Sequence, residues 1–564
     1  MLKRIKNILI LFSTFLVVFI TVQLITVYIN GLSAQVPPKR EFRAIWITTL
    51  NNSDWPSKKG LPIEEQKKEF IAILDQCAKS NINAVIVQIR PAGDAFYKSS
   101  FEPWSEWLMG KQGMSPPSDY DPLEFMIQEA HKRQIELHAW MNPLRAVYNR
   151  YSDVHDRHIS KVNPQWFFKY GGTTFFNPGI PEVRDYICKV VFDVASRYDI
   201  DGIHFDDYFY PYPNSDEKLK DDNTFWKYRN GIRDKSEWRR ENVNSLIEAI
   251  HEGLGAIRPE LKFGISPSAV WRNIYDSPLG SYTRAGVASY DHLHADIRLW
   301  LEKEWIDYVI PQIYFSTEHK HANYRTLVKW WNRNTFNRHL YIGQAAYKIY
   351  WDRDKAWYSK QEMPKQLSYN RSLTQVKGSV FFRANSFMRN RGNFRDSLET
   401  NWYKYPSITP PMPWKDDVPP RKPDNFKLTL QSGGMQLSWE KPAPAQDNDN
   451  ASRYILYKLP LDSHPDMIEN PQNILAIVDG DQFSFIDTTV NSYETHEFLI
   501  TSLDKLNNES APAKPQIEPI LVLDKFSFRE FRYYFSFFEN GISNHFGWLK
   551  QVENTVAEGI ETGR

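Results

Sequence analysis

The segment Asp201–Pro211 carries the residues best suited to chemistry in this chain. Two adjacent carboxylates, Asp206 and Asp207, directly follow a short apolar run. Alternate side chains of an extended strand share a face, so His204 and Asp206 point the same way. A carboxylate at a strand end can act as nucleophile, base or metal ligand, whereas the structural alternative is an Asp pair that caps a helix or braces a loop. The aromatic residues that follow favour a functional role for Asp206. For Asp207, a functional role and a structural role both stay open.

Cleavage of a glycosidic bond needs two carboxyl groups, close together for retention of configuration and farther apart for inversion. Asp206 supplies one of them, and the sequence leaves its partner open. The candidates by position are Asp207, Asp94, Glu102 and Glu106.

Aromatic and amide side chains gather at the same predicted strand ends. Aromatic rings offer apolar faces that can stack on sugars, although each ring taken alone more often belongs to a hydrophobic core. Their convergence on one face favours an extended sugar-binding cleft. The predicted substrate contacts are Trp46, Arg90, Trp104, Trp140, Asn142, His204, Tyr208, Tyr210, Gln312 and Tyr314.

Short β-branched and apolar runs alternate with helical patterns from residue 41 onward, which is typical of βαβ units with a parallel sheet. An open doubly wound sheet has the same rhythm, but no glycine-rich phosphate turn follows the first strand. Eight strands and the missing turn favour an α/β fold of the (β/α)8 TIM-barrel type, whose chemistry lies at the carboxyl ends of the strands. The predicted strands are Phe42–Thr48, Ala84–Ile89, Glu136–Met141, Gly202–Asp206, Lys262–Ser266, Tyr308–Ile313, Leu340–Gln344 and Ser379–Arg383.

Helices are expected between these strands, where apolar residues recur at spacings of three and four. They are Glu64–Ser80, Pro122–Arg133, Pro181–Tyr198, Arg239–Ile257, Ala295–Glu304, Tyr324–Asn332 and Met363–Leu373.

Composition narrows the function classes. The 564 residues have a formal net charge of +1, which argues against a nucleic-acid partner because duplex binding needs a basic surface. Aromatic residues make up 15% of the chain. Cys77 and Cys188 fall in predicted helices and are expected to be buried free thiols, so a disulfide scaffold and a four-cysteine zinc site are excluded.

No metal or other cofactor is predicted. His292 and His294, with Asp296, have a spacing compatible with a metal site, but the start of a capped helix is the preferred interpretation. A third function hypothesis is a polysaccharide deacetylase, and that activity would need a metal.

The amino terminus predicts export. Lys3, Arg4 and Lys6 precede the apolar stretch Ile8–Ile29, which is long enough to span a bilayer. Leu32–Ala34 offers a small-residue cleavage site, so a cleaved signal peptide and an uncleaved membrane anchor both remain open for residues 1–34. Either one keeps the amino terminus in the cytoplasm and sends the rest outside it, to the periplasm or cell envelope.

A second domain follows the barrel, which is expected over residues 41–402. Seven prolines between 406 and 423 predict a stiff linker over residues 403–420. Alternating runs over residues 421–515, such as Met435–Trp439 and Arg453–Lys458, predict a small antiparallel sandwich and resemble a fibronectin type III domain. Such a domain implies a spacer or a contact with envelope proteins. Residues 516–564 form an aromatic-rich tail without a predicted role.

Several ordered motifs between residues 40 and 400 resemble the bacterial glycosyl-hydrolase-like family ten of TIM-barrel proteins. The matching stretches are Glu41–Ile47, Asn83–Pro91, Phe101–Ser105, His138–Pro143, Asp201–Pro211, Phe263–Pro267 and Pro311–Tyr314. The resemblance implies an extracytoplasmic glycosidase, and one group of the family cleaves peptidoglycan glycan strands that have lost their peptides. Some members are lipoproteins, and this chain has no cysteine near its amino terminus for such an attachment. The alternative hypothesis is a non-catalytic protein that binds cell-wall glycan.

Overall fold

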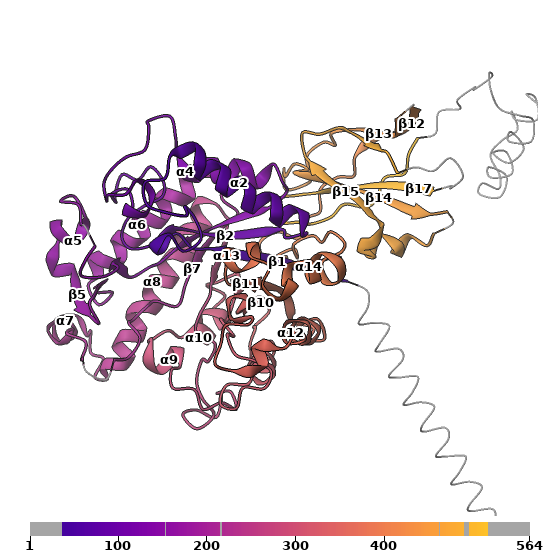
Figure 1. Cartoon of the computed structure of the whole chain (residues 1–564). Helices are drawn as coiled ribbons and strands as arrows, with labels where there is room; N and C mark the ends of the chain where they lie inside the picture. Colours follow the sequence, from indigo (N-terminus) through magenta and orange to yellow (C-terminus); the bar gives the residue numbers. More distant parts are fainter. Residues whose placement is uncertain are drawn as a thin grey trace, which may run out of the picture.

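Eight parallel strands close into a barrel in the computed structural model, which describes residues 37–516 apart from 153, 215–216, 432, 462 and 490–495 (Figure 1). Each strand pairs with its neighbours in chain order and the last pairs with the first, so the predicted TIM barrel is confirmed. The barrel strands are β1 (Phe42–Ile47), β2 (Ala84–Arg90), β3 (Glu136–Met141), β7 (Gly202–Phe205), β8 (Lys262–Ile265), β9 (Tyr308–Val309), β10 (His339–Gln344) and β11 (Val376–Phe381).

Helices cover the outside of the barrel at the positions that the apolar spacing predicted. Asp121 starts α4 by accepting hydrogen bonds from the backbone N–H groups of Leu123 and Glu124, and Pro122 occupies its first turn. The main helices are α2 (Ile63–Lys79), α4 (Pro122–His131), α6 (Pro181–Arg197), α8 (Lys235–Ile257), α10 (Ile297–Glu302), α11 (Tyr324–Asn332) and α12 (Glu362–Arg371).

Shorter helices lie in the connections between these elements. The α-helical ones are α3 (Glu106–Met109), α5 (Ile159–Val162), α7 (Asp222–Tyr228), α9 (Ser289–His292), α13 (Ala384–Met388) and α14 (Phe394–Ser397). The 3-10 segments are η1 (Leu50–Asn52), η2 (Pro164–Trp166), η3 (Ala346–Lys348), η4 (Lys355–Tyr358), η5 (Arg391–Asn393), η7 (Pro465–Glu469) and η8 (Pro471–Asn473), and η6 (Leu398–Trp402) is a π-helix.

The strand side chains divide between two cores. Ile45 and Ile47 of β1 pack outward against the helices, while Phe42, Ala44 and Trp46 fill the barrel interior. Phe42 stacks on Tyr341 of β10 with ring centroids 4.1 Å apart. The interior is therefore packed, and ligands have access only to its ends.

An antiparallel sheet that the sequence analysis did not predict follows β3. It contains β4 (Arg145–Val147), β5 (Phe167–Tyr170) and β6 (Thr173–Phe176), in the order β4-β6-β5. The sheet extends the loop after β3 at the carboxyl end of the barrel, where it positions Arg145.

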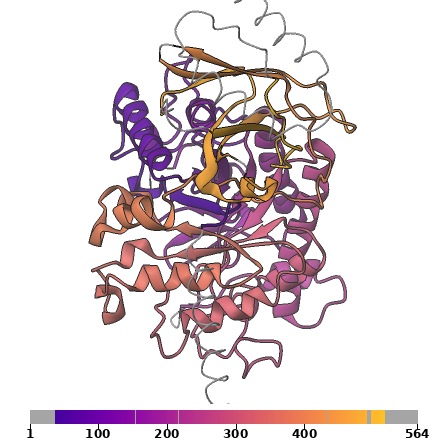
Figure 2. The same ribbon diagram turned by 90° about the vertical axis from the view of Figure 1, so that its right-hand side faces the viewer.

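A two-sheet β-sandwich follows the barrel, as predicted (Figure 2). One sheet has the order β12-β13-β16 and the other β15-β14-β17, and the assignment to the fibronectin type III family stays a prediction. The strands are β12 (Asp424–Gln431), β13 (Gly434–Glu440), β14 (Arg453–Pro460), β15 (Ile474–Asp479), β16 (Ser484–Asp487) and β17 (His496–Leu503).

The proline-rich segment lies against the amino-terminal end of the barrel instead of standing away from it. Ile408 forms a parallel bridge with Arg40, and Trp414 Nε1 donates to Asp307 Oδ1 at 2.9 Å. The predicted linker over residues 403–420 thus packs on the barrel along part of its length. The prolines keep the segment extended, and its apolar side chains pack on the surface of the barrel.

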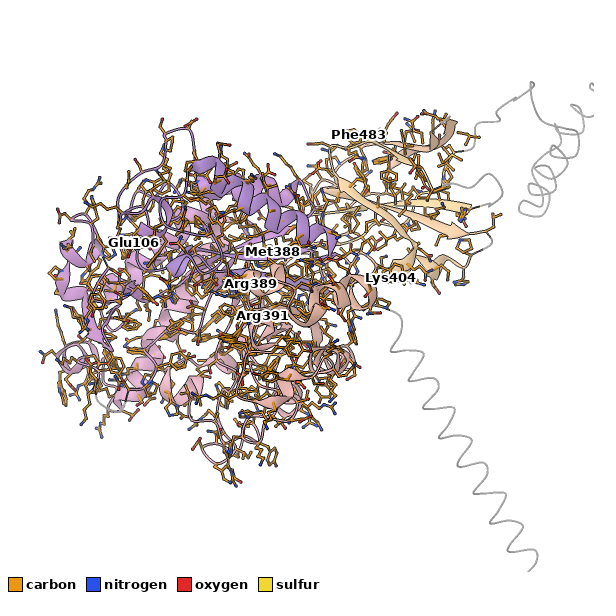
Figure 3. The ribbon with its side chains drawn as sticks, in the orientation of Figure 1. Glu106, Met388, Arg389, Arg391, Lys404 and Phe483 are labelled. Atoms are coloured by element: carbon orange, nitrogen blue, oxygen red, sulfur yellow. The ribbon has the colours of Figure 1, made fainter. Side chains whose placement is uncertain are left out.

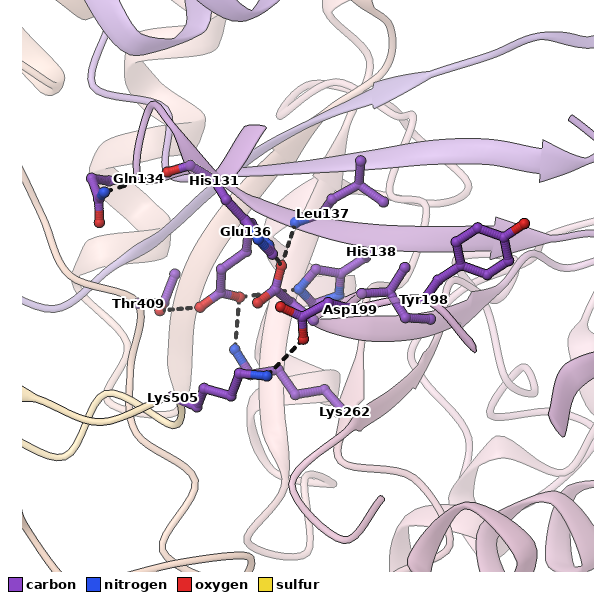
Figure 4. Close-up of polar contacts among 12 residues, drawn as sticks. His131, Gln134, Glu136, Leu137, His138, Tyr198, Asp199, Lys262, Thr409 and Lys505 are labelled. Carbon is purple, nitrogen blue, oxygen red and sulfur yellow. Dashed lines mark hydrogen bonds and ion pairs between the residues drawn. The ribbon is translucent and has the colours of Figure 1, made fainter. Parts of the chain in front are cut away.

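Glu136, at the start of β3, joins the barrel, the linker and the sandwich (Figure 4). It accepts hydrogen bonds from Lys262 Nζ at 2.7 Å, from Thr409 Oγ1 at 2.6 Å and from Asn507 Nδ2 of the sandwich at 3.2 Å. Lys505 of the sandwich also pairs with Asp199 at 2.7 Å. These contacts fix the sandwich at the end of the barrel opposite to the carboxyl ends of its strands.

The two cysteines are buried free thiols, as predicted. The predicted signal or anchor over residues 1–34 and the tail from residue 517 lie outside the described residues. Within the described residues, the helices are all too short or too polar to cross a bilayer.

Candidate active site

Strand β7 delivers Asp206 and Asp207 to the carboxyl end of the barrel. Both side chains are buried, with 3% and 5% of their surface exposed. His204 points into the barrel interior, as the strand alternation predicted, since it contacts Ser266 at the end of β8 and Tyr308 of β9. The two carboxyl groups therefore lie at the mouth of the barrel, on top of a packed interior.

Asp206 is held by hydrogen bonds from β3 and from the chain that follows it. Trp140 Nε1 donates to Oδ2 at 3.0 Å, and Asn142 Nδ2 donates to both oxygens, at 3.0 and 2.9 Å. The backbone N–H of Tyr208 donates to Oδ1 at 3.3 Å. Three protein groups thus orient this carboxyl and favour its ionised form.

Burial raises the pKa of Asp206 to about 6, and the negative charge of Asp207 contributes to the rise. The guanidinium of Arg145 and the hydrogen bonds from Asn142 and Trp140 act in the opposite direction. A carboxyl group with this pKa exchanges protons near neutral pH, as general acid–base catalysis requires.

Asp207 has different partners from its neighbour. Gln312 Nε2 donates to its Oδ1 at 2.9 Å, and the hydroxyl of Tyr212 donates to its Oδ2. The same Gln312 amide donates to the backbone oxygen of Ser266 at 2.8 Å, which ties the ends of β7 and β8 to the segment after β9. Burial also raises the pKa of Asp207. Adjacent carboxyl groups titrate as a pair, and the charge of Asp207 raises the pKa of Asp206.

Arg145 is the functional candidate that the sequence analysis missed. Its guanidinium lies over the ring of Tyr208, 4.7 Å from the centroid, and its Nε donates to Pro91 O at 3.0 Å. Its positive charge lowers the pKa of both Asp206 and Asp207. The signal that could have identified it is its position, three residues after Asn142 and just beyond the end of β3.

Tyr212 was also missed, although it lies only five residues beyond Asp207. It is 36% exposed and meets Tyr208 edge to face at 5.7 Å, so it combines a bond to Asp207 with an accessible ring. The loop after β8 exposes two further rings, those of Tyr275 and Tyr282.

His204 supports the site without carrying charge. Its Nε2 lies 2.9 Å from Ser266 Oγ and 3.5 Å from Trp46 Nε1, while Nδ1 lies 3.2 Å from the hydroxyl of Tyr308. Burial and the nearby His138 hold the pKa of His204 well below its usual range, so the ring is neutral. His204 and Trp46 are both almost fully buried, which assigns them to the packed floor beneath the carboxyl groups.

Arg90 and Glu102, predicted as a substrate contact and a catalytic carboxyl, bind each other. Arg90 Nη2 lies 2.6 Å from Glu102 Oε1, its Nε lies 2.8 Å from Oε2, and both side chains are buried. The remaining nitrogen of Arg90 donates to the backbone oxygens of Asn142 and Pro143. Arg90 thus supports the loop that presents Asn142, and Glu102 neutralises Arg90.

Asp94 and Glu106, the other two candidate carboxyl groups, bind residues other than Asp206. Gln112 Nε2 donates to Asp94 at 3.3 Å, and burial raises the pKa of Asp94 to about 7. Glu106 pairs with Lys59 at the start of α3, on the part of the barrel far from the sandwich (Figure 3). Among the described residues, the side chains that donate to the carboxyl of Asp206 are Trp140 and Asn142. The structure therefore brings Asp207, and not Asp94, Glu102 or Glu106, next to Asp206.

The predicted aromatic contacts divide by exposure. Trp104, Tyr208 and Tyr314 are half-buried at the carboxyl end of the barrel, and Trp140 is mostly buried but bonded to Asp206. Tyr210 is fully buried against Phe168 and His294, which makes it a packing residue.

The segment around His294 is a capped helix start, as preferred. Asp296 accepts a hydrogen bond from the backbone N–H of Leu299 at 3.3 Å and starts α10. His294 Nε2 lies 3.3 Å from Arg239, a cation that repels any metal ion at this ring. The arrangement therefore does not resemble a metal centre.

The chain is similar to known proteins over most of its length. Residues 41–359 match the family described as Glycosyl hydrolase-like 10. The chain is 41% identical over 486 residues to the glycosyl hydrolase YngK of Bacillus subtilis (strain 168), which covers 85% of this chain and 94% of that protein. It is 37% identical over 366 residues to the glycosyl hydrolase DigH of Escherichia coli (strain K12), with coverage of 60% and 82%.

The solved structures that match the chain are more distant from it in sequence. The glycoside hydrolase domain of PgaB from Bordetella bronchiseptica has a TM-score of 0.43 at 12% identity and covers 64% of this chain and 99% of its own. The endo-1,4-beta-mannanase of Rhizomucor miehei has a TM-score of 0.40 at 11% identity and covers 65% and 98%.

The family match and the relative YngK both extend over more than half of the chain, and they include Asp206, Asn142 and Gln312 within the matched range. The chain belongs to the Glycosyl hydrolase-like 10 family, as its sequence motifs predicted.

Proposed function

We propose that this protein hydrolyses glycosidic bonds in bacterial cell-wall glycan, with peptide-free peptidoglycan strands as its substrate. The observation that carries the proposal is the buried pair Asp206 and Asp207 at the barrel mouth, with Trp140 and Asn142 bonded to Asp206. The names of its relatives, glycosyl hydrolases YngK and DigH, support the reaction class.

In the proposed mechanism, Asp206 acts in its ionised form, as nucleophile or base. The hydrogen bonds from Trp140, Asn142 and Tyr208 stabilise the carboxylate and fix its direction. Asp207 is the proposed second carboxyl of the site, because it is buried beside Asp206 at the mouth of the barrel. The positive charge of Arg145 limits the mutual repulsion of the pair when both groups are ionised.

The exposed rings around the barrel mouth suit a sugar polymer. Tyr212, Tyr275 and Tyr282 belong to loops that follow β7 and β8, and their exposed fractions are 36%, 72% and 83%. Tyrosine rings bind sugars through their faces without requiring charge, which agrees with a glycan that has lost its charged peptides.

The proposed location is outside the cytoplasm, in the periplasm or cell envelope. Lys3, Arg4 and Lys6 ahead of the apolar stretch Ile8–Ile29 support it. Fusion of alkaline phosphatase after residue 516 tests it, because that enzyme is active only outside the cytoplasm; an inactive fusion that is present in full length contradicts this location.

The test of activity uses the purified full chain with amidase-treated peptidoglycan strands, and separates released sugars by chromatography and mass spectrometry. We expect products from the wild type and from Asp119→Asn, which removes an exposed carboxylate on the surface. Asp206→Asn is expected to lower the rate about 10³-fold or more. Equal rates for Asp206→Asn and wild type contradict the mechanism, and the absence of products from wild type contradicts the substrate.

A further inference from the structure

A set of buried polar side chains runs through the packed interior of the barrel, from the end that carries the sandwich to the active site. It consists of Glu136, His138, Tyr308, His204 and Ser266, and we call it the interior network. These residues belong to β3, β7 and β9 and to the end of β8, which are adjacent around the barrel. They are at most 5% exposed, so their polar groups depend on one another for hydrogen bonds.

Glu136 forms the end of the interior network at the sandwich. Its Oε1 accepts from Thr409 of the linker at 2.6 Å and from Asn507 of the sandwich at 3.2 Å. Its Oε2 accepts from Lys262 Nζ at 2.7 Å and lies 3.1 Å from His138 Nε2 (Figure 4). Burial acts to raise the pKa of Glu136, but the charge of Lys262 holds that pKa well below its usual range. The carboxylate is therefore ionised and can only accept hydrogen bonds.

Two histidines share one hydroxyl group in the middle of the network. The hydroxyl of Tyr308 lies 2.8 Å from His138 Nδ1 and 3.2 Å from His204 Nδ1. Burial raises the pKa of Tyr308 well above its usual range, so the phenol keeps its proton. One proton can be donated to one ring only, so Tyr308 must donate to one histidine and accept from the other.

Trp46 determines which histidine is the donor. Its indole Nε1 can only donate, and its acceptor among the described residues is His204 Nε2, at 3.5 Å. Ser266 Oγ lies 2.9 Å from the same nitrogen and 3.4 Å from the backbone oxygen of Phe205, so its hydroxyl also donates to His204. His204 Nε2 thus carries no proton, and the neutral ring holds its proton on Nδ1 and donates it to Tyr308.

The proton positions in the rest of the network follow from this one. Because Tyr308 accepts from His204, its own proton is donated to His138 Nδ1. His138 then holds its proton on Nε2, which faces the carboxylate of Glu136. Protons on both nitrogens of His138 would leave the buried phenol proton without an acceptor, which is costly. Each donor from Ser266 to His138 therefore points along the network toward Glu136.

Ser266 connects the network to the active site. Its backbone oxygen accepts from Gln312 Nε2 at 2.8 Å, and the same nitrogen donates to Asp207 Oδ1 at 2.9 Å. The side chain of Ser266 is held by His204 and its backbone oxygen orients the Gln312 amide. A change in the orientation of the His204 ring is therefore passed to the amide that binds Asp207.

We propose that Tyr308 and His138 are positioning residues for the carboxyl pair, which act through His204 and Ser266 on the bond between Gln312 and Asp207. This inference rests on the proposed function, because it concerns the rate of reaction at the same site. It also gives the sandwich a role in that site. The contacts of Thr409 and Asn507 with Glu136 help to fix the carboxylate that sets the direction of every hydrogen bond in the network.

The first test needs no substrate and uses the wild type. The chain has 14 histidines, and nitrogen-15 NMR of the histidine-labelled full chain distinguishes the two neutral tautomers from the charged ring. The signals are assigned by their loss in His138→Gln and His204→Gln. At pH 7 we expect a proton on Nδ1 of His204 and on Nε2 of His138. A proton on Nε2 of His204, or a doubly protonated His138, overturns the proposal.

The second test removes one hydroxyl group from the network. Tyr308→Phe leaves His204 Nδ1 without its acceptor and is expected to lower kcat about 10-fold, with KM changed by less than about twofold. The matched control is Tyr341→Phe, since the hydroxyl of Tyr341 is also buried in the barrel and binds a histidine outside the network, His339, at 2.9 Å. We expect the control to keep the wild-type kcat. Equal kcat values for the two variants overturn the proposal.

A third measurement separates this inference from the proposed function. Gln312 lowers the pKa of Asp207, so a weaker bond between them in Tyr308→Phe is expected to move the titration of the Asp206–Asp207 pair to higher pH. Carbon-13 NMR of the aspartate-labelled chain follows that titration without substrate, and Tyr341→Phe again serves as the control. A wild type without turnover contradicts the proposed function alone. An unshifted titration in Tyr308→Phe overturns the role of the network.

Discussion

Nδ2 of Asn142 lies 3.0 Å from Oδ1 and 2.9 Å from Oδ2 of Asp206, so one amide nitrogen bridges the whole carboxyl group. The orientation of this amide is fixed from the other side, because Asn142 Oδ1 accepts the backbone N–H of Arg145 at 2.7 Å. The end of β3 therefore determines the direction of the carboxyl that β7 supplies.

Replacement of Asn142 by Ala is expected to lower kcat about 10–100-fold, with a smaller effect on KM. The reason is that a hydrogen bond to a charged group contributes about 1.5–3 kcal/mol, and here it positions the group that reacts. Steady-state kinetics on a defined glycan oligomer measures the effect. Thermal unfolding of the variant separates a loss of positioning from a loss of folding, and an unchanged kcat contradicts the role of Asn142.

Replacement of Arg145 by Gln is expected to move the acid limb of the pH profile upward. Asp206 has a pKa of about 6, and Arg145 lowers it. Removal of that charge raises the pKa, so the ionised form is lost at a higher pH and activity falls earlier as the pH decreases. The measurement is kcat/KM between pH 4.5 and 8. Arg145→Lys keeps the charge and should retain the wild-type limb; an unshifted limb in Arg145→Gln excludes Asp206 as the titrating group.

Replacement of Glu136 by Gln is expected to destabilise the protein by roughly 3–5 kcal/mol, because it leaves the buried ammonium of Lys262 without a counter-charge. The pKa of Glu136 lies well below 4.5, chiefly because the charge of Lys262 overcomes the effect of burial. Its contribution is therefore complete above about pH 4.5 and is lost as the pH falls through the lowered pKa.

Urea unfolding of the wild type and Glu136→Gln at several pH values tests this prediction. The difference in unfolding free energy is expected to be largest at pH 7 and to shrink at low pH. Asp119→Asn, which removes an exposed charge, provides the control. A difference that is independent of pH contradicts the ion pair as its cause.

Local sequence patterns were sufficient to predict the barrel. They were not sufficient to predict which side chains contact the carboxyl groups at its mouth. The run Ala84–Ile89 is apolar throughout, which predicts a strand buried on both sides, and strand alternation correctly oriented His204 and Asp206. Glu102 is indistinguishable from a catalytic carboxyl until its pairing with Arg90 is known.

The partners that the sequence did not reveal come from other strands or distant loops. Arg145 reaches the carboxyl pair because the unpredicted sheet of β4, β5 and β6 folds the loop after β3 over the barrel mouth. Trp414 belongs to a proline-rich segment typical of a spacer, and only the three-dimensional packing shows that it binds Asp307. Composition predicts the extended conformation of such a segment but not the surface on which it lies.

The ion pair between Arg90 and Glu102 gives a prediction that separates positioning from substrate binding. Both side chains are buried, so Glu102→Gln leaves an unpaired guanidinium and is expected to cost roughly 3–5 kcal/mol of stability. The double variant Arg90→Met/Glu102→Leu removes both charges and is expected to recover most of that stability. It should still have a reduced kcat, because the backbone oxygens of Asn142 and Pro143 lose their donor. Urea unfolding and steady-state kinetics of both variants measure these effects; a double variant that raises KM and leaves kcat unchanged assigns Arg90 to the substrate instead.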